Sequence, residues 1–322
     1  AGTEHRHRVG HTDAFRNVMG DEDCRFVLPP YDAVDIVGDR QARLIVQRGK
    51  GFVEQQNSRV GCQCAYECAA LAHTTIIQHE NPAFRLKAIK NDVELDNLRA
   101  AHIKDGLALT KLMYWLKQNA GKVPMDEISV DEKLLALRAQ QEHFISPSFD
   151  TICAYRANAA MMHYRATPES HAVIEAKDLL LIDSGAQYLE GTTDITRTFA
   201  MGPVTEEMKA NFTRVLRANL NLANARFLYG CSGVNLDVLA RQPLWEANLD
   251  YKHGTGHGVG HVLNVHEGPN GFHWGRKGYA ATLEEGMVTT DEPGIYIEGK
   301  YGIRLENELV CRKGDKNEYG QF

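Results

Sequence analysis

The sequence predicts an α+β fold in which two similar halves share one sheet. The first observation is the order of its segments, because two helices are followed by strands and the same order then returns. The second is size: the chain has 322 residues, of which 43% are hydrophobic. A chain of this size can form one large domain of roughly 200–250 residues and a smaller one.

Two helices open the first half. Asn91 and Glu94 have the spacing of an N-cap residue and its capping glutamate, and apolar residues recur at helical spacing behind them. This helix should end near Gly121 and Pro124. A second capping box at 129–132 predicts a helix that continues to about residue 141.

Apolar periodicity places the remaining elements. Strands are predicted over 151–155, 160–164, 179–183 and 194–200, helices over 205–227 and 236–247, and strands again over 262–265, 287–291, 295–297 and 303–311. Residues 83–322 are therefore expected to form the main domain. Residues 1–82 read as a partial or divergent N-terminal region, in which 33–38 and 42–47 resemble short strands.

Seven cysteines are scattered along the chain, a pattern typical of reduced cytoplasmic thiols rather than of a disulfide framework. Cys62, Cys64 and Cys68 form a cluster. A zinc site there would need His73 or His79 as a fourth ligand, and the spacing matches none of the paired zinc patterns. Small buried thiols beside an alanine-rich helix are the preferred interpretation.

Charge and hydropathy exclude several classes of function. The formal net charge of -6 gives no general attraction to nucleic acid or to anionic membranes. No run of about 18 apolar residues occurs, so no membrane span is expected. The N-terminal residues lack the apolar core of a signal peptide. We therefore expect a cytoplasmic protein that binds neither nucleic acid nor membrane.

Two aspartates stand at the ends of adjacent predicted strands. Asp183 ends the apolar run 179–182, and Asp194 opens the strand that follows the next turn. Either residue alone is best interpreted as a turn or cap residue. Two strands joined in this way can nevertheless bring both carboxylates to one point.

A glycine-rich stretch carries three histidines. His253, His257 and His261 lie within nine residues that also contain four glycines. This glycine content argues against a helical metal motif and lets backbone or ligand approach closely. A lone histidine is usually structural, but three in such a stretch favour a functional site around His257.

Two glutamates complete the candidate set. Glu292 follows a predicted strand and precedes a Pro-Gly turn; its neighbour Asp291 is an alternative, and both could simply cap the turn. Glu306 lies on a strand where Arg304 and Glu308 would share its face. A charged face of this kind can also be the solvated side of an edge strand.

Together these side chains form a set of oxygen and nitrogen ligands that suits manganese, iron, cobalt or zinc better than copper. The set is Asp183, Asp194, His257, Glu292 and Glu306. Two metal ions about 3.5–4 Å apart can share bridging carboxylates and a water whose pKa they lower. Without metal, so many buried acids would repel one another. The sequence thus predicts a two-metal hydrolase site.

From about residue 81 onward the sequence resembles the aminopeptidase P branch of the pita-bread metallopeptidases, most closely its long bacterial form. The resemblance rests on motifs that are highly specific in combination. They lie at 86–91, 159–164, 181–186, 191–198, 253–269, 291–294 and 302–307. It implies a curved antiparallel sheet flanked by helices, with pseudo-two-fold symmetry.

The resemblance also implies a reaction: removal of the N-terminal residue from peptides with proline in second place, by attack of a metal-bridging water or hydroxide. The cofactors would be two divalent ions, manganese or alternatively zinc or cobalt, and a homodimer is a further expectation. In this family pattern Asp183 would bind one ion. Asp194 and Glu306 would bridge, while His257 and Glu292 would bind the other ion.

Four further residues receive roles from the resemblance. His163, His253 and His266 would line the substrate site, with His266 contacting the peptide and stabilising the developing oxyanion. Arg304 would orient a metal-bound carboxylate. Arg156 stands where family members usually carry glycine, and an arginine there can crowd the pocket.

Two other functions remain open. A prolidase would cut Xaa-Pro dipeptides only, and a non-catalytic pita-bread module or inactive fragment would turn over nothing. Residues 1–80 do not resemble a complete N-terminal domain of the family, and the sequence given stops at Phe322, where family members continue. The sequence around His257 and Glu306 favours the aminopeptidase over the prolidase, and the intact ligand set argues against a non-catalytic module.

Overall fold

The computed structural model describes residues 81–275 and 281–322, and residues 84–322 form one compact unit. The strands predicted at 33–38 and 42–47 and the cysteine cluster at 62–68 lie outside the described residues. The division of the chain into an N-terminal region and a main domain stays a prediction. Among the described residues, no helix combines the length and the apolarity needed to cross a membrane.

The first helix pair follows the short helix α5 (Pro82–Ala88). α6 (Asp92–Asn119) begins at the predicted capping box, since the Asn91 side chain accepts from the Glu94 backbone and Glu94 accepts from the Asn91 backbone. α7 (Glu127–Arg138) begins earlier than predicted. Asp126 is its N-cap and exchanges hydrogen bonds of 2.7 and 2.9 Å with Ser129, so the box predicted at 129–132 is wrong.

The strands of the first half are antiparallel and form two small sheets, β1-β4-β5 and β2-β3-β6. Their bounds are β1 (Phe144–Pro147), β2 (Ile152–Tyr155), β3 (Leu179–Ser184), β4 (Ala186–Tyr188), β5 (Gly191–Thr192) and β6 (Ile195–Ala200). The strand predicted over 160–164 is wrong. A 3-10 helix, η1 (Arg156–Ala160), and a turn occupy that region, where the Tyr164 hydroxyl donates to the buried Glu127 carboxylate.

The second half repeats the order with two helices and then short strands, as predicted. The helices are α8 (Glu206–Ala223) and α9 (Gly233–Trp245). The strands are β7 (Gly256–His257), β8 (Gly271–Phe272), β9 (Val288–Asp291), β10 (Gly294–Ile297), β11 (Tyr301–Arg304), β12 (Asn307–Val310), β13 (Lys316–Asn317) and β14 (Gly320–Gln321). Residues 262–265 form a loop instead of the predicted strand, and Val262 there has a φ of 51°.

The long strand predicted over 303–311 is interrupted between β11 and β12. β11 pairs with β10, whereas β12 pairs with β9. At the interruption the Glu306 backbone N–H donates to the carbonyl of Thr196 at 3.1 Å, so the chain here is tied to the first half. The break therefore places Glu306 against the start of β6.

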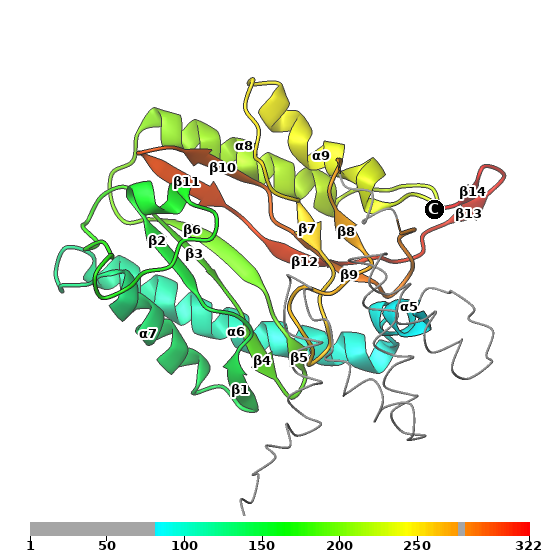
Figure 1. The fold of residues 1–322 in the computed structure, drawn as a ribbon, viewed down its shortest axis with the longest axis horizontal. Helices are drawn as coiled ribbons and strands as arrows, with labels where there is room; N and C mark the ends of the chain where they lie inside the picture. Colours follow the sequence, from blue (N-terminus) through cyan, green and yellow to red (C-terminus); the bar gives the residue numbers. More distant parts are fainter. Residues whose placement is uncertain (1–80, 276–280) are drawn as a thin grey trace, which may run out of the picture. The chain divides into compact units, whose positions relative to one another are not determined.

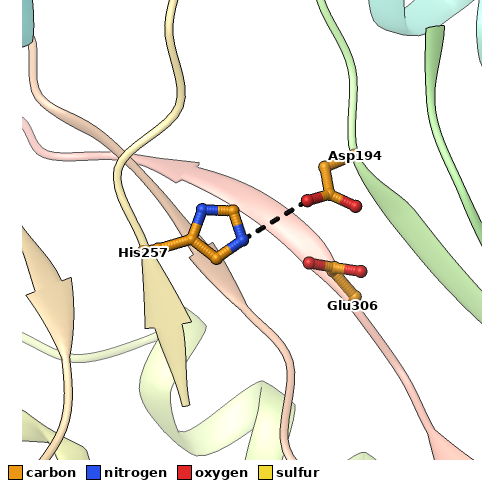
Figure 2. A group of neighbouring side chains, drawn as sticks. All are labelled: Asp194, His257 and Glu306. Atoms are coloured by element: carbon orange, nitrogen blue, oxygen red, sulfur yellow. Dashed lines mark ion pairs between the residues drawn. The ribbon is translucent and has the colours of Figure 1, made fainter. Parts of the chain in front are cut away.

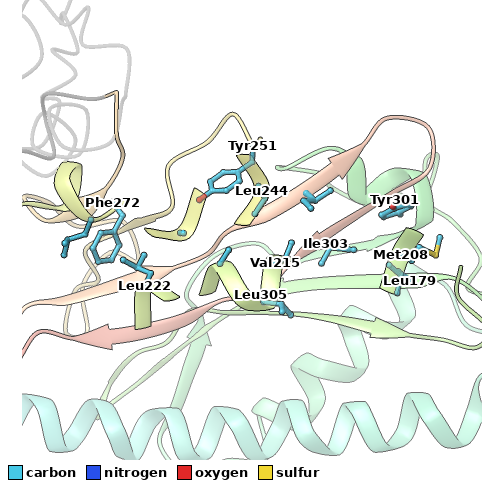
Figure 3. Packing of buried hydrophobic residues seen from close by; sticks show 14 of the residues in the cluster. Leu179, Met208, Val215, Leu222, Leu244, Tyr251, Phe272, Tyr301, Ile303 and Leu305 are labelled. Atoms are coloured by element: carbon cyan, nitrogen blue, oxygen red, sulfur yellow. The ribbon is translucent and has the colours of Figure 1, made fainter. Parts of the chain in front are cut away.

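Each helix pair packs on the strands over its own core. α6 and α7 lie on one side of the strands and α8 and α9 on the other (Figure 1). Leu180 and Ile182 of β3 pack with the leucines of α6 and α7. Leu179, by contrast, packs in the core that contains Val215 of α8 and Ile303 of β11 (Figure 3). Burial of each such side chain contributes about 1.5–3 kcal/mol, so both layers hold the strands between them.

Candidate metal centre

The two predicted aspartates lie on one antiparallel hairpin. Asp183 is the fifth residue of β3 and pairs in register with Thr196, two residues after Asp194. Because side chains alternate along a strand, Asp183 faces away from α6 and α7, opposite to Leu180 and Ile182. Both carboxylates are buried, with 8% of Asp183 and 4% of Asp194 exposed.

Three of the five predicted ligands converge closely. The ligand atoms of Asp194, His257 and Glu306 all lie within 4.8 Å of one another. Figure 2 shows these side chains pointing toward one another from three separate segments. The His257 Nε2 atom lies 3.4 Å from Asp194 Oδ2. Residues from separate parts of the sequence thus form a compact group with one imidazole and two carboxylates.

The His257 ring is oriented by its own backbone surroundings. Its Nδ1 atom lies 3.0 Å from the carbonyl oxygen of Gly258, and its backbone N–H donates to Thr290 Oγ1 at 3.0 Å. Because a carbonyl only accepts, Nδ1 is the donor in this contact, and Nε2 is the ring nitrogen on the side of the carboxylates. A histidine held in this way can bind a metal through Nε2.

Glu292 also lies beside this histidine. Its Oε1 atom is 3.6 Å from His257 Nε2, and Thr290 Oγ1 donates to it at 3.4 Å. The alternative residue Asp291 is fully buried, and both of its carboxylate oxygens lack a hydrogen-bond partner. On β9, Asp291 faces the side opposite to Thr290, which contacts His257. Glu292, which follows β9, is the acid beside His257.

Asp183 stands slightly apart from the three-residue cluster and is paired with Arg304. The Arg304 guanidinium donates to Asp183 Oδ2 from Nη2 at 2.5 Å and from Nε at 3.2 Å. The other oxygen, Oδ1, is buried without a hydrogen-bond partner. One oxygen is therefore held in place by Arg304 while the second is left to accept a cation.

The electrostatics of the cluster favour a bound cation. Burial, followed by the neighbouring carboxylates, raises the pKa of Asp194 and of Glu306 well above the ordinary range. Asp194 Oδ1 is also buried without a partner. A divalent ion would remove the repulsion and satisfy the unpaired oxygens, so this donor set fits the predicted metal ions.

His253 is connected to Asp183 by a chain of hydrogen bonds. Its Nδ1 atom donates to the Gly254 carbonyl at 2.6 Å, and its Nε2 atom accepts from the Tyr296 hydroxyl at 2.9 Å. Arg304 Nη1 donates to the same hydroxyl at 2.7 Å. Burial and the charge of Arg304 lower the pKa of His253 to about 3, so this ring is neutral.

The other two predicted substrate residues are more exposed. The ring of His266 lies 4.3 Å from that of His257, at an angle of 88°. His163 lies in an exposed turn after η1 and contributes to the lowered pKa of His253, after burial, Arg304 and Arg241. Arg156 pairs with Asp178 at 2.9 Å, and its φ of 53° is a conformation that favours glycine.

Several residues of the site were not predicted. Tyr296 gives no signal in the sequence, because an aromatic residue on a strand reads as core. Glu308 was expected on the face of Glu306 and was given no role in the site. It accepts from the Asp194 backbone N–H at 3.0 Å, and His102 Nε2 lies 3.1 Å from it. Only the folded structure brings these groups together.

The sequence matches the model of metallopeptidase family M24 over residues 96–313. A probable Xaa-Pro aminopeptidase P of Sclerotinia sclerotiorum is 47% identical over 243 residues, which cover 74% of this chain and 40% of that protein. A protein of the same name from Paracoccidioides brasiliensis is 47% identical over 236 residues, or 38% of its length. The chain thus spans less than half the length of these relatives.

Solved structures match the fold. The X-prolyl aminopeptidase of Caenorhabditis elegans, described as a cytosolic enzyme with a di-nuclear active site, gives a TM-score of 0.70 at 39% identity, over 75% of this chain and 39% of that one. The prolidase of Pyrococcus furiosus gives 0.63 at 30% identity, over 72% and 64%. These matches confirm the predicted pita-bread fold. Because the family model covers more than half of the sequence, the chain belongs to metallopeptidase family M24.

Proposed function

We propose that this chain is a metal-dependent aminopeptidase that cleaves the bond between an N-terminal residue and a following proline. One observation carries the proposal: ligand atoms of Asp194, His257 and Glu306 lie within 4.8 Å of one another inside an M24 fold. The names of the fungal and nematode relatives supply the substrate class. Those relatives are longer, so their activity is carried to this chain as a proposal.

In this proposal Asp194, Glu306 and His257 would hold the divalent ions, together with Asp183 and Glu292 beside them. When bound, the ions supply Lewis acidity that polarises a peptide carbonyl and lowers the pKa of a water molecule toward neutrality. The carboxylate-rich set favours manganese, with zinc or cobalt as alternatives.

The chain's own residues then divide the remaining tasks. Arg304 fixes the carboxylate of Asp183. His253 uses both ring nitrogens in hydrogen bonds, to Gly254 and to Tyr296, so it shapes the site and transfers no proton. The exposed His266, beside the ring of His257, is placed to donate to a substrate carbonyl oxygen.

The state of the cysteines supports an intracellular location for the enzyme. Cys153, Cys231 and Cys311, the described cysteines, are free thiols, as is usual in a reducing compartment. The nematode relative is described as cytosolic. We therefore propose a cytoplasmic location for this chain as well.

The test is an assay of the purified chain with added manganese and a matched pair of substrates, an Xaa-Pro-Xaa tripeptide and an Xaa-Pro dipeptide. Release of the first residue from the tripeptide, abolished by a chelator, is the expected result. Cleavage of the dipeptide alone would instead support a prolidase, for which the match to the Pyrococcus furiosus enzyme is the favouring observation. Metal-free protein without turnover would indicate a non-catalytic module.

A further inference from the structure

We propose that Lys87 and Lys90 are positioning residues that hold the loop carrying His257 and His266. We call residues 253–270 the histidine loop. Both lysines belong to the segment at the end of α5, more than 160 residues away in sequence, and each contacts this loop directly. The inference rests on the proposed function, because it concerns the geometry of a proposed metal ligand.

Lys90 is the more buried of the two lysines. Only 4% of the residue is exposed, and its Nζ atom donates to the carbonyl of Val259 at 2.5 Å. Its backbone N–H donates to the Gly286 carbonyl at 3.0 Å, which fixes the lysine from behind. Burial of an ammonium group is costly unless hydrogen bonds compensate. The hydrogen bond from Lys90 therefore restrains the backbone at Val259, two residues after His257.

Lys87 acts on the other end of the same loop. Its Nζ atom forms an ion pair with Glu267, the residue after His266, and the Glu267 side chain is only 12% exposed. The Glu267 backbone N–H donates to the Gly258 carbonyl at 2.8 Å. Glu267 thus lies against the residue that follows His257, so a single ion pair restrains both histidines.

The loop has little regular structure of its own. β7 has two residues, and the backbone returns at Gly258 so closely that a Cβ there would lie 2.0 Å from the Glu267 carbonyl oxygen. Val262 adopts a φ of 51° between the two contacts. Its backbone hydrogen bonds are few and scattered, such as those from Gly258 to Asn270 at 2.9 Å and from Gly260 to Asn264 at 3.0 Å, so contacts from side chains elsewhere add to its support. Lys87 and Lys90 supply such contacts.

The experiment compares Lys87→Gln and Lys90→Met with the control Arg85→Gln. Arg85 lies on α5 like Lys87, but its guanidinium donates to Glu284 at 2.8 Å and, among the described residues, forms no hydrogen bond or ion pair with the histidine loop. Manganese affinity is measured by titration, and amide hydrogen exchange of residues 258–267 is measured in the metal-free protein.

We expect both lysine variants to lose about 10- to 100-fold in metal affinity, the range typical of partners that orient a ligand. Their loop amides should exchange faster, while Arg85→Gln keeps wild-type values. Lys87→Arg, which preserves the ion pair, should restore both readouts. If Lys90→Met does not fold, the comparison of Lys87→Gln with Lys87→Arg tests the inference.

Unchanged loop exchange in Lys87→Gln would overturn the inference, as would equal losses in Arg85→Gln, which would indicate a general role of α5. The two proposals fail in different ways. Wild-type protein that binds no manganese would contradict the proposed function, whereas the exchange rates of the metal-free loop test the two lysines independently of metal.

Discussion

The hairpin of β3 and β6 and the histidine loop both contribute ligands to the candidate centre, but they are held in different ways. β3 and β6 pair over six residues each, and β3 is also paired to β2. The histidine loop contains only the two-residue strand β7 before its irregular part. The hairpin therefore holds Asp183 and Asp194 through a continuous backbone ladder, whereas the loop that carries His257 has only short backbone pairings and is also contacted by distant side chains.

This contrast shows why a metal centre can combine rigid and adjustable parts. The carboxylates occupy positions that the core of α6, α7 and β3 determines. The imidazole lies on a segment that Lys87 and Lys90 contact, and the segment's own Asn270 donates to the carbonyl of Val288 at 2.8 Å. Changes in the hairpin should thus affect the whole domain, and changes in the loop should act mainly on the metal.

The largest effect is expected from a ligand on the hairpin. Asp194→Ala removes a carboxylate of the closest cluster, so manganese binding and turnover should both be abolished. Elemental analysis and the tripeptide assay measure this. Asp291→Asn is the matched control, since Asp291 is a buried acid that faces away from His257, and it should keep its metal. Activity retained in Asp194→Ala would contradict the two-metal assignment.

A smaller effect is expected from the residue that orients Asp183. Arg304→Lys keeps the charge but cannot reproduce the two contacts with Asp183 and the third with Tyr296. We expect a loss of about 10- to 100-fold in metal affinity, measured by titration. Tyr296→Phe, which removes one hydroxyl, should lose less. Wild-type affinity in Arg304→Lys would show that Asp183 needs no such support.

The hairpin can also be weakened through its core. Leu180 of β3 is fully buried between α6 and α7, so Leu180→Ala should lower the free energy of unfolding by about 2–5 kcal/mol. Denaturant unfolding of the metal-free protein measures this loss. Folded Leu180→Ala should still bind manganese, because the substitution lies on the face opposite Asp183. If Leu180→Ala lost metal binding but kept its stability, the hairpin would not act through the stability of the domain, and this would contradict the difference between the hairpin and the loop.

The sequence was most informative where structure is regular. The capping pair Asn91 and Glu94 and the apolar run before Asp183 predicted α6 and β3, because local spacing decides such elements. Two predicted strands, 160–164 and 262–265, are wrong for a common reason. Their apolar residues lie in turns whose conformation is set by distant contacts, such as the hydrogen bond from Tyr164 to Glu127.

The residues of the site likewise fall into those that could be predicted from local sequence and those that could not. The strand-end acids and the glycine-flanked histidine were recognisable as candidates, because their residue types and motifs are local features. Tyr296, Lys87 and Lys90 were not, since an aromatic residue on a strand and a lysine near a helix end have ordinary structural explanations. Their contacts join parts of the chain up to 180 positions apart, as in the ion pair between Lys87 and Glu267. Contacts between such distant residues cannot be predicted from the spacing of residues in the sequence.

The most direct test of the central assignment is anomalous X-ray diffraction from crystals of the chain grown with manganese. The assignment of Asp183, Asp194, His257, Glu292 and Glu306 predicts two anomalous peaks, both in contact with Asp194 and Glu306. One of them should also contact His257. A single peak, or peaks that leave His257 without a metal contact, would contradict the two-metal centre proposed for this protein.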